Sequence, residues 1–417
     1  MAGNSLLTTS MITKEALRVL KNQTPFSKKV NRQYDKRFAV SGAKIGDNIT
    51  IRKPPRYQVT TGSALEIQDS AEQSVNLQLD TQKHVGMAFN SKDLTPSIDE
   101  FSDRFILPAV TALGADMDFT GYNGMYKKIY SAVGVPSATA LPSTLKGFTQ
   151  AKAKIAMLGG PQSPLTAIVD PNVEASLVEG LKGLFQSSSE IKKQYEEGVM
   201  GYAAGSEFRS SQSVAKHTIG QLGGATPQTN YPSTAYVAGA TSLITDGWTA
   251  SVANRLKKGD VIQIAGVYAV NPLTRQSTGE LAQFVLTADA DSDSSGNVTM
   301  SLDRGMYASG QLQNVDALPA NNANITVFGS ATAYASVIAP QNLVFHKDAF
   351  AMGCADLELP QGLDMAARAT DEESGLSIRL IRDYDINSDR IVTRLDVLFG
   401  WVCMYPEFAC RVVGQPA

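Results

Sequence analysis

Residues 97–130 of the chain, SIDEFSDRFILPAVTALGADMDFTGYNGMYKKIY, have the pattern of one long amphipathic helix. Ser97 and Glu100 form an S-x-x-E capping box, which satisfies unpaired backbone N–H groups of a first helical turn. Pro108 lies inside the pattern, so we expect a kink or a cost of about 3 kcal/mol there. The apolar residues recur every three or four positions: Ile98, Phe101, Phe105, Ile106, Val110, Leu113 and Met117. Three glycines weaken the prediction toward the far end: Gly114, Gly121 and Gly124.

The composition is that of a folded protein without a membrane span. The 417 residues predict two or three domains, and no apolar run reaches the roughly 18 residues that cross a membrane. The start, MAGNSLLTTS, has no signal-peptide pattern, and Ala2 stands where myristoylation needs glycine. Cys354, Cys403 and Cys410 form no C-x-x-C, so we expect neither a disulfide framework nor a zinc site, as in a reducing cytoplasm.

Positive charge is concentrated near the N-terminus. Residues 1–56 hold twelve basic and three acidic side chains, a formal charge of +9, although the whole chain carries −3. A basic arm on an acidic body can contact nucleic acid, an acidic partner or a neighbouring copy, and a solvated surface explains it equally well. Residues 11–22 predict a short helix with four inward side chains, and a polar arm follows to about residue 41. The inward residues are Ile12, Ala16, Leu17 and Leu20.

An extended hairpin arm comes next. Residues 45–79 predict two strands joined by a polar tip. The apolar residues from Val75 to Phe89 keep one parity, so this stretch forms one long strand or two. Because an isolated hairpin is barely stable in water, the arm needs a surface to lie on, either its own body or another subunit.

The middle of the chain alternates helices and strands. Residues 144–158 predict a helix ended by Gly-Gly-Pro, 165–169 a buried strand and 173–185 a third helix. Residues 190–214 predict a charged helix, a glycine-rich loop and a short strand. A hairpin closes the chain, with alternating strands on both sides of a turn at 387–389.

A β-rich insertion separates these parts. Residues 217–340 are rich in small and polar residues and contain short alternating runs, which suggest a small barrel or sandwich. In the strand after Lys258-Gly259-Asp260, four residues share one parity and Gln263 lies on the other face. The four are Ile262, Ile264, Tyr268 and Val270.

No motif predicts catalysis. The three histidines, His84, His217 and His346, lie far apart in sequence, and His346 fits a buried structural histidine better than a base. Phosphate-loop, nucleophile-elbow and zinc-protease motifs are absent from the sequence. We therefore expect no catalytic residue, no cofactor and no enzyme.

One acidic cluster imitates the start of a calcium loop: Asp289, Asp291 and Asp293. Ser294 and Met300 occupy positions that such a loop gives to glycine and glutamate. We expect a hairpin turn here and no metal site.

Four segments, in this order, resemble one family. They are EEGVMGYAAGSEFRSSQSV at 196–214, KKGDVIQIAGV at 257–267, NLVFHKDAFAMGCADL at 342–357 and IRDYDINSDRIVTRLDVLFGWV at 381–402. With the arms and the long helix, they resemble the major capsid proteins of tailed double-stranded-DNA bacteriophages, whose fold is named for phage Hong Kong 97. The chain is most similar to the coat-protein family of short-tailed Salmonella phages, which carries an inserted β-barrel.

The resemblance implies an α+β, Hong Kong 97-type capsid fold. Its parts would be an N-terminal arm at 1–41, an E-loop hairpin at 42–80, a capsid core at 81–217 plus 341–417, and an accessory β-barrel at 218–340. Within the core, residues 97–130 would be the spine helix. The segment 75–95 and the C-terminal hairpin would form the peripheral domain, and 140–215 with 341–370 the axial domain.

The implied function is structural. Pentamers and hexamers of the chain would form an icosahedral virion shell around phage DNA, assembled in the bacterial cytoplasm. The implied partners are copies of the chain, a scaffolding protein, a portal and non-specifically contacted DNA, with no membrane. On the E-loop we expect subunit contacts through Arg52, Lys53 and Arg56. On the N-terminal arm we expect DNA or scaffold contacts through Lys28, Lys29, Arg32, Lys36 and Arg37.

Two other functions stay open at this point. An encapsulin-like compartment shell would share the fold and enclose an enzyme instead of DNA. A carbohydrate-binding or enzymatic protein built on the β insertion would show that activity in an isolated 218–340 fragment.

Overall fold

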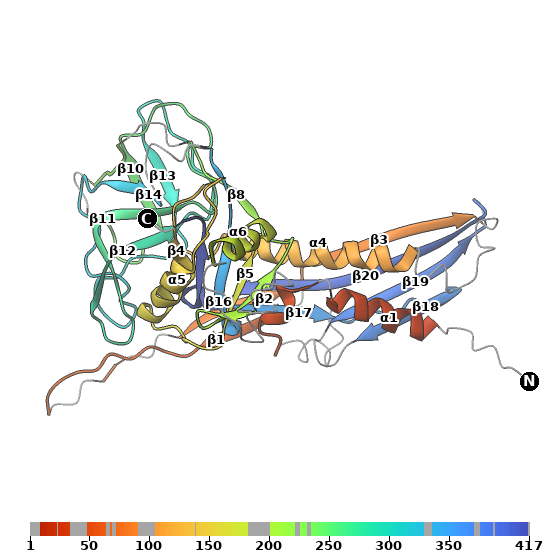
Figure 1. Cartoon of the computed structure of the whole chain (residues 1–417). Helices are drawn as coiled ribbons and strands as arrows, with labels where there is room; N and C mark the ends of the chain where they lie inside the picture. Colours follow the sequence, from red (N-terminus) through yellow and green to blue (C-terminus); the bar gives the residue numbers. More distant parts are fainter. Residues whose placement is uncertain are drawn as a thin grey trace, which may run out of the picture. The chain divides into compact units, whose positions relative to one another are not determined.

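Figure 1 shows the chain as a computed structural model. The structure describes residues 9–22, 24–33, 48–63, 67–68, 72–90, 105–137, 139–181, 201–221, 226–231, 235–328, 336–370, 376–386 and 388–415. By its internal contacts the chain divides into two compact units. Unit 1 comprises residues 1–51, 74–122 and 350–404, and unit 2 comprises residues 52–73, 123–349 and 405–417. The predicted domain boundaries do not coincide with this division and stay a prediction.

The long helix is present and shorter than predicted. Helix α4 spans Leu107–Tyr126, preceded by a π-helical turn at Phe105 and Ile106. The proposed capping box at Ser97 and Glu100 lies outside the described residues. The apolar stripe is confirmed where it can be seen: Ile106, Val110, Leu113 and Met117 are buried.

One detail of the helix prediction is wrong. The helix ends at Tyr126 and not at Tyr130, because Lys128 and Ile129 donate backbone hydrogen bonds back only three residues and close a tighter turn. Pro108 directly follows the π-helical turn and Leu107, and the kink expected there stays a prediction.

Glycine at position 121 allows α4 to continue past the predicted weak point. A Cβ at Gly121 would lie 2.2 Å from Cε2 of Trp401, so only a glycine lets the indole reach the helix backbone. The packing gained here outweighs the poor helix propensity of glycine.

Unit 1 is built on one antiparallel sheet that confirms the C-terminal hairpin. Strands β19 (Ser377–Asp385) and β20 (Arg390–Cys403) pair along the hairpin, and β18 (Met365–Thr370) pairs with β19. The long β20 also pairs with β3 (Thr81–Asn90) and, toward its end, with β17 (Phe350–Ala355). Helix α1 (Thr9–Asn22) contacts β18 and β19.

The inward face predicted for the first helix is largely confirmed. Ala16, Leu17 and Leu20 are buried, and the side chain of Ile12 lies outside the described part of the chain.

The polar arm predicted after α1 is not a free arm at residues 24–33. Phe26 is fully buried, and its ring stacks on Trp401 with the centroids 5.2 Å apart. Tyr122 and Phe350 contact the same ring edge to face, with centroids 5.2 and 5.5 Å away. The prediction failed because one aromatic side chain in a basic segment gives no periodic signal.

Unit 2 contains a second sheet, whose strand order is β4-β21-β16-β5-β7-β6. Its strands are β4 (Ala132–Val133), β5 (Leu165–Val169), β6 (Tyr202–Ala203), β7 (Ser206–Ser210), β16 (Asn342–His346) and β21 (Ala409–Val412). Helices α5 (Lys146–Met157) and α6 (Pro171–Leu181) share one apolar core with a single face of this sheet. The predicted helix at 144–158 and strand at 165–169 are confirmed.

The inserted segment is β-rich, as predicted. Strands β8 (Lys216–Thr218) and β15 (Ile338–Pro340) pair where the segment begins and ends. Between them lie two three-stranded sheets, with orders β13-β10-β9 and β12-β11-β14. These strands are β9 (Gln228–Thr229), β10 (Ser242–Asp246), β11 (Val261–Val270), β12 (Ser277–Val285), β13 (Val298–Ser301) and β14 (Ile325–Val327). Both sheets contribute to one apolar core, and a closed barrel stays a prediction.

The predicted parity of β11 is wrong at one residue. Ile262, Ile264 and Val270 are buried, whereas Tyr268 is exposed. The register with β12 shifts between Gln263 and Tyr268, where Gly266 has a φ of +78°. This bulge reverses the in-and-out alternation, which a strict period of two cannot anticipate.

The hairpin arm is confirmed, and the strand question is resolved in favour of two strands. Strand β1 (Asn48–Lys53) pairs with β2 (Gln73–Gln78), and β3 is a separate strand. Beyond the paired strands, residues 57–63 are exposed.

We predict opposite effects for two alanine substitutions in α4. Gly121→Ala forces Cβ into the Trp401 indole and lowers the free energy of unfolding by about 1–3 kcal/mol. Gly124→Ala, whose Cβ meets nothing within 4 Å, raises it by about 0.5–1 kcal/mol through helix propensity. Urea unfolding followed by circular dichroism gives both values, and equal midpoints for the two variants would contradict the packing argument.

Candidate assembly surfaces

The three arm residues predicted to contact a neighbour have partners within the same chain. The Arg52 guanidinium lies 3.8 Å from the Glu72 carboxylate across the hairpin. The Lys53 ammonium lies over the Tyr405 ring, 5.1 Å from its centroid. Arg56 donates a hydrogen bond to Glu407 with Nη2 and Oε1 separated by 3.0 Å. Contacts of these residues with another subunit stay a prediction.

The outer part of the arm exposes apolar side chains. Tyr57, Val59 and Ile67 are 65%, 91% and 89% exposed. Gln58 and Gln68 hydrogen-bond across the hairpin, the Gln58 N–H donating to the Gln68 side-chain oxygen over 2.9 Å. The arm therefore keeps its extended form and leaves apolar surface in water, which is typical of a segment that binds another surface.

The basic residues predicted to contact DNA or a scaffold are only partly described. Lys28 is exposed, while Lys29 and Arg32 are half-buried near the short 3-10 helix at Ser27–Lys29. Lys36 and Arg37 lie outside the described residues.

A buried carboxylate fixes this N-terminal segment to α4. Asp118 is fully buried and accepts hydrogen bonds from the backbone N–H groups of Phe26 and Ser27, over 3.2 and 2.9 Å. The Ser27 hydroxyl also donates to it over 2.7 Å. The apolar pattern alone did not predict this site, although an aspartate directly after Met117, at the edge of the apolar stripe, was its signal.

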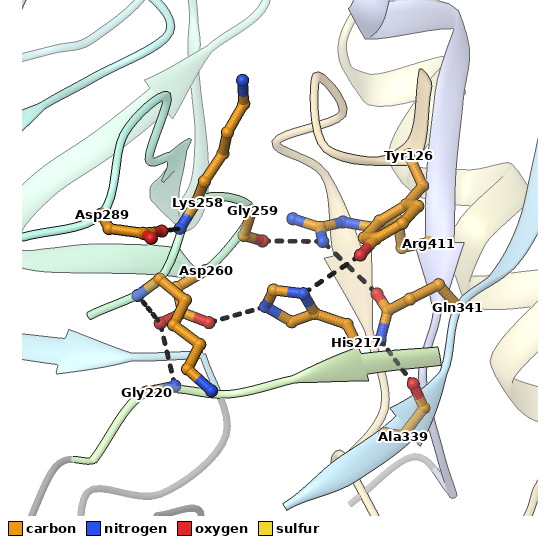
Figure 2. Close-up of polar contacts among 11 residues, drawn as sticks. Tyr126, His217, Gly220, Lys258, Gly259, Asp260, Asp289, Ala339, Gln341 and Arg411 are labelled. Carbon is orange, nitrogen blue, oxygen red and sulfur yellow. Dashed lines mark hydrogen bonds and ion pairs between the residues drawn. The ribbon is translucent and has the colours of Figure 1, made fainter. Parts of the chain in front are cut away.

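A buried polar network joins the inserted segment to the rest of unit 2 (Figure 2). His217 and Asp260 are buried, and the imidazole Nε2 lies 2.7 Å from the Asp260 carboxylate. The carboxylate accepts a hydrogen bond from Nε2–H, and the other ring nitrogen, Nδ1, lies 3.2 Å from the Tyr126 hydroxyl. Asp260 also accepts from the backbone N–H groups of Gly220 and Lys257, so its charge is fully solvated by the protein.

Arg411 extends this network from the last strand, β21. Its buried guanidinium donates to the Gly259 carbonyl over 2.9 Å and to the Gln341 side-chain oxygen over 3.3 Å. Burial lowers the pKa of Arg411 to about 10 and raises the pKa of Tyr126 to about 12. At neutral pH, Arg411 is charged and Tyr126 keeps its proton, as their hydrogen bonds require.

A second seam links the inserted segment to the chain after α4. The Gln283 side-chain amide bonds both the N–H and the carbonyl of Ala132, over 2.9 and 3.1 Å. The Arg304 guanidinium lies 3.5 Å from the centroid of the buried Tyr130 ring. Burial raises the pKa of the adjacent Asp303 to about 6. Because the partners lie about 150 residues apart in sequence, no motif predicted this seam.

The residues considered for chemistry have structural partners. Asp289 and Asp291 accept from the backbone N–H groups of Lys258 and Asn254 on an earlier segment, whereas Asp293 accepts from the N–H of Ser295 within its own turn. Within the described residues, no group of three or more histidine, cysteine or acidic side chains could hold a metal ion. None of the described helices is long and apolar enough to cross a membrane.

The other predicted residues of interest are also in structural settings. The three cysteines are buried with free thiols. His84 is exposed on β3, whereas His346 is buried and accepts the backbone N–H of Asp348 at Nδ1 over 3.3 Å.

The fold is mixed α/β, and the candidate residues that the structure describes serve structural contacts. A family model described as "P22 coat protein - gene protein 5" matches residues 1–414. The chain belongs to this family. The resemblance seen in the sequence is confirmed, with the mixed α/β capsid fold that it implies.

Individual relatives are more distant. The major capsid protein of Acyrthosiphon pisum secondary endosymbiont phage 1 is 25% identical over 263 residues, which cover 60% of this chain and 60% of that protein. The solved structure from Mycobacterium phage Che8 is 11% identical, covers 93% of this chain and 90% of that one, and has a TM-score of 0.42. The capsid of cyanophage P-SCSP1u is 11% identical over 89% of this chain and 84% of that one, with a TM-score of 0.43.

We predict that Asp118→Asn loosens the N-terminal segment. The variant loses the charge that strengthens three hydrogen bonds, so the free energy of unfolding falls by about 1.5–3 kcal/mol. The matched control is Asp116→Asn on the same helix, which breaks only the exposed ion pair with Lys83 and costs at most about 1 kcal/mol. Urea unfolding and protease cleavage near residues 24–33 test this, and equal losses for the two variants would refute the anchoring role.

We predict that His346 makes the coat protein less stable in acid. Burial lowers the pKa of His346 below its ordinary value of 6.5, so the unfolded chain binds the proton more readily and stability falls as the pH drops below about 6.5. His346→Asn keeps an acceptor for the Asp348 N–H and cannot be protonated. The variant should lose less stability than the wild type between about pH 8 and about pH 5.5. Parallel losses in the two proteins would contradict this assignment.

Proposed function

We propose that the chain assembles with copies of itself, as pentamers and hexamers, into an icosahedral shell that encloses phage double-stranded DNA. The observation that carries this proposal is the hairpin arm, whose outer residues 57–63 are exposed and include apolar side chains. An isolated hairpin of this kind gains little from its own chain, so a neighbouring copy is the surface that it fits.

The segment roles follow from this proposal. Residues 42–80 act as the E-loop, residues 97–130 contain the spine helix, and the inserted segment at 218–340 acts as the accessory domain. The sheet that contains the C-terminal hairpin takes the peripheral position, and the six-stranded sheet with α5 and α6 takes the axial position. Support comes from the order of the elements along the chain and from the family match.

Weak contacts between subunits are sufficient to hold a shell together, because the shell repeats each contact many times. In a closed symmetric shell, each arm contact recurs in every subunit, so interfaces that are weak one at a time hold the assembly together. Arg52, whose side chain is 79% exposed, is the arm cation most available to an acidic group on a neighbour.

The basic N-terminal segment suits a polyanion. We assign Lys28, Lys29, Arg32, Lys36 and Arg37 to contacts with packaged DNA or an acidic scaffolding protein. Such contacts weaken steeply with salt and carry no sequence preference. A portal completes the expected partners, since a shell that packages DNA needs an entry point.

We predict that reversing the arm charges prevents normal assembly. In the triple variant Arg52→Glu, Lys53→Glu and Arg56→Glu, like charges meet the acidic surface of the neighbouring copy, so the yield of closed shells falls by about tenfold or more. Sedimentation and negative-stain electron microscopy of the purified protein measure that yield.

The control for this experiment is Lys347→Glu, which reverses one exposed charge outside the arm. Unfolding midpoints of both variants show whether the subunit still folds. Normal shells in normal yield from the triple variant would count against the arm as a subunit contact, and solitary molecules from the wild type would refute shell formation itself.

A further inference from the structure

A partly buried ion pair holds the base of the hairpin arm, directly before its exposed residues 57–63. The Arg56 and Glu407 side chains are 37% and 14% exposed, with Nη2 and Oε1 3.0 Å apart. The Arg52–Glu72 pair of the same arm differs, because its side chains are 79% and 57% exposed and 3.8 Å apart. An ion pair shielded from water is screened less than an exposed one, so Arg56–Glu407 holds its geometry more firmly.

The base of the arm contacts a short hydrogen-bonded turn. Tyr405 stacks on Phe408 with ring centroids 4.8 Å apart and an angle of 20° between the rings. Pro406–Phe408 form a 3-10 turn, closed by the hydrogen bond from the Phe408 N–H to the Tyr405 carbonyl. Lys53 lies over the Tyr405 ring, so two successive cations of the arm contact one preformed turn.

Charged groups of both signs surround the pair. Arg56 and Glu407 line a groove of about 410 Å³ together with Arg304 and Asp303. Within this groove, Glu407 is the carboxylate to which Arg56 donates its hydrogen bond.

The held part and the free part of the arm are adjacent in sequence. Lys53, Pro55 and Arg56 are half-buried, and every residue from 57 to 63 is exposed. A fixed base directly before an exposed segment sets the direction in which that segment leaves the subunit.

We propose that Arg56–Glu407 and Lys53–Tyr405 form a latch within one chain that aims the hairpin arm. This assignment replaces the direct neighbour contact proposed above for Lys53 and Arg56. The two are positioning residues of their own subunit, and Arg52 with the exposed arm beyond them contacts the neighbouring copy. This inference rests on the proposed function for its role in assembly, whereas the latch itself is a property of the single chain.

The latch is tested by exchanging the charges of residues 56 and 407, first within one chain and then between two variant chains that are mixed. Arg56→Glu and Glu407→Arg should each reduce the shell yield by about tenfold, because a misdirected arm recurs in every copy. The double variant R56E/E407R restores the pair within each chain and should assemble as the wild type does. An equimolar mixture of the two single variants should assemble as poorly as either one alone. Restoration by the mixture would show that the pair forms between copies and would overturn the proposal.

A second measurement does not require shells. Hydrogen exchange of residues 52–60 in the unassembled full-length chain should be faster in each single variant and should return to the wild-type rate in R56E/E407R. Glu72→Arg is the matched control, since it breaks only the exposed Arg52 pair, and it should leave the exchange of residues 55–60 unchanged. Unchanged exchange in Glu407→Arg would refute the latch even if the wild type forms shells. A wild type that forms no shells but shows this exchange pattern would refute only the proposed function.

Discussion

The indole of Trp401 lies against the backbone of α4 at Gly121, and unit 1 depends on this close approach. Phe26 stacks on the same indole, so three segments far apart in sequence meet at one aromatic cluster. Asp118, less than one turn before Gly121, captures the backbone beside Phe26. Apolar packing and a charge-assisted hydrogen-bond site thus fix the same N-terminal segment, and neither would hold it in place if α4 lay farther from β20.

In unit 2, buried polar contacts join the inserted segment to its neighbours. The inserted segment has its own apolar core, which continues into Tyr130 and Ala132 after α4. Around this core, Asp260 and Gln283 reach out from the insertion to groups on neighbouring segments. Buried polar contacts require exact partners, so they fix one orientation of the insertion, whereas apolar contact alone would allow several. A coat protein needs such a fixed orientation if identical copies are to meet at identical surfaces.

Local patterns predicted the local structure, and contacts between distant segments escaped them. The strand at 165–169, the hairpin around β19 and β20 and the apolar stripe of α4 follow from periodicity in short windows. The bulge around Gly266 moved Tyr268 to the surface. The five steps from Gln263 to Tyr268 face two steps from Gln283 to Leu281, and this odd excess reverses an alternating pattern. The ion pair of Glu407 with Arg56 was not predicted, because nothing in the sequence around Glu407 shows that Arg56 lies opposite it. Contacts between side chains hundreds of residues apart depend on the completed fold.

The pairing of β8 with β15 has a consequence for how this gene can change. The inserted segment enters and leaves through two adjacent antiparallel strands, so its ends stay together whatever lies between them. Residues can be gained, lost or exchanged in the inserted segment between β8 and β15 without disturbing the register of β16 beside β5. The inserted segment is therefore a natural place for evolutionary diversification and for grafting foreign sequence, provided that the residues corresponding to Asp260 and Gln283 are retained.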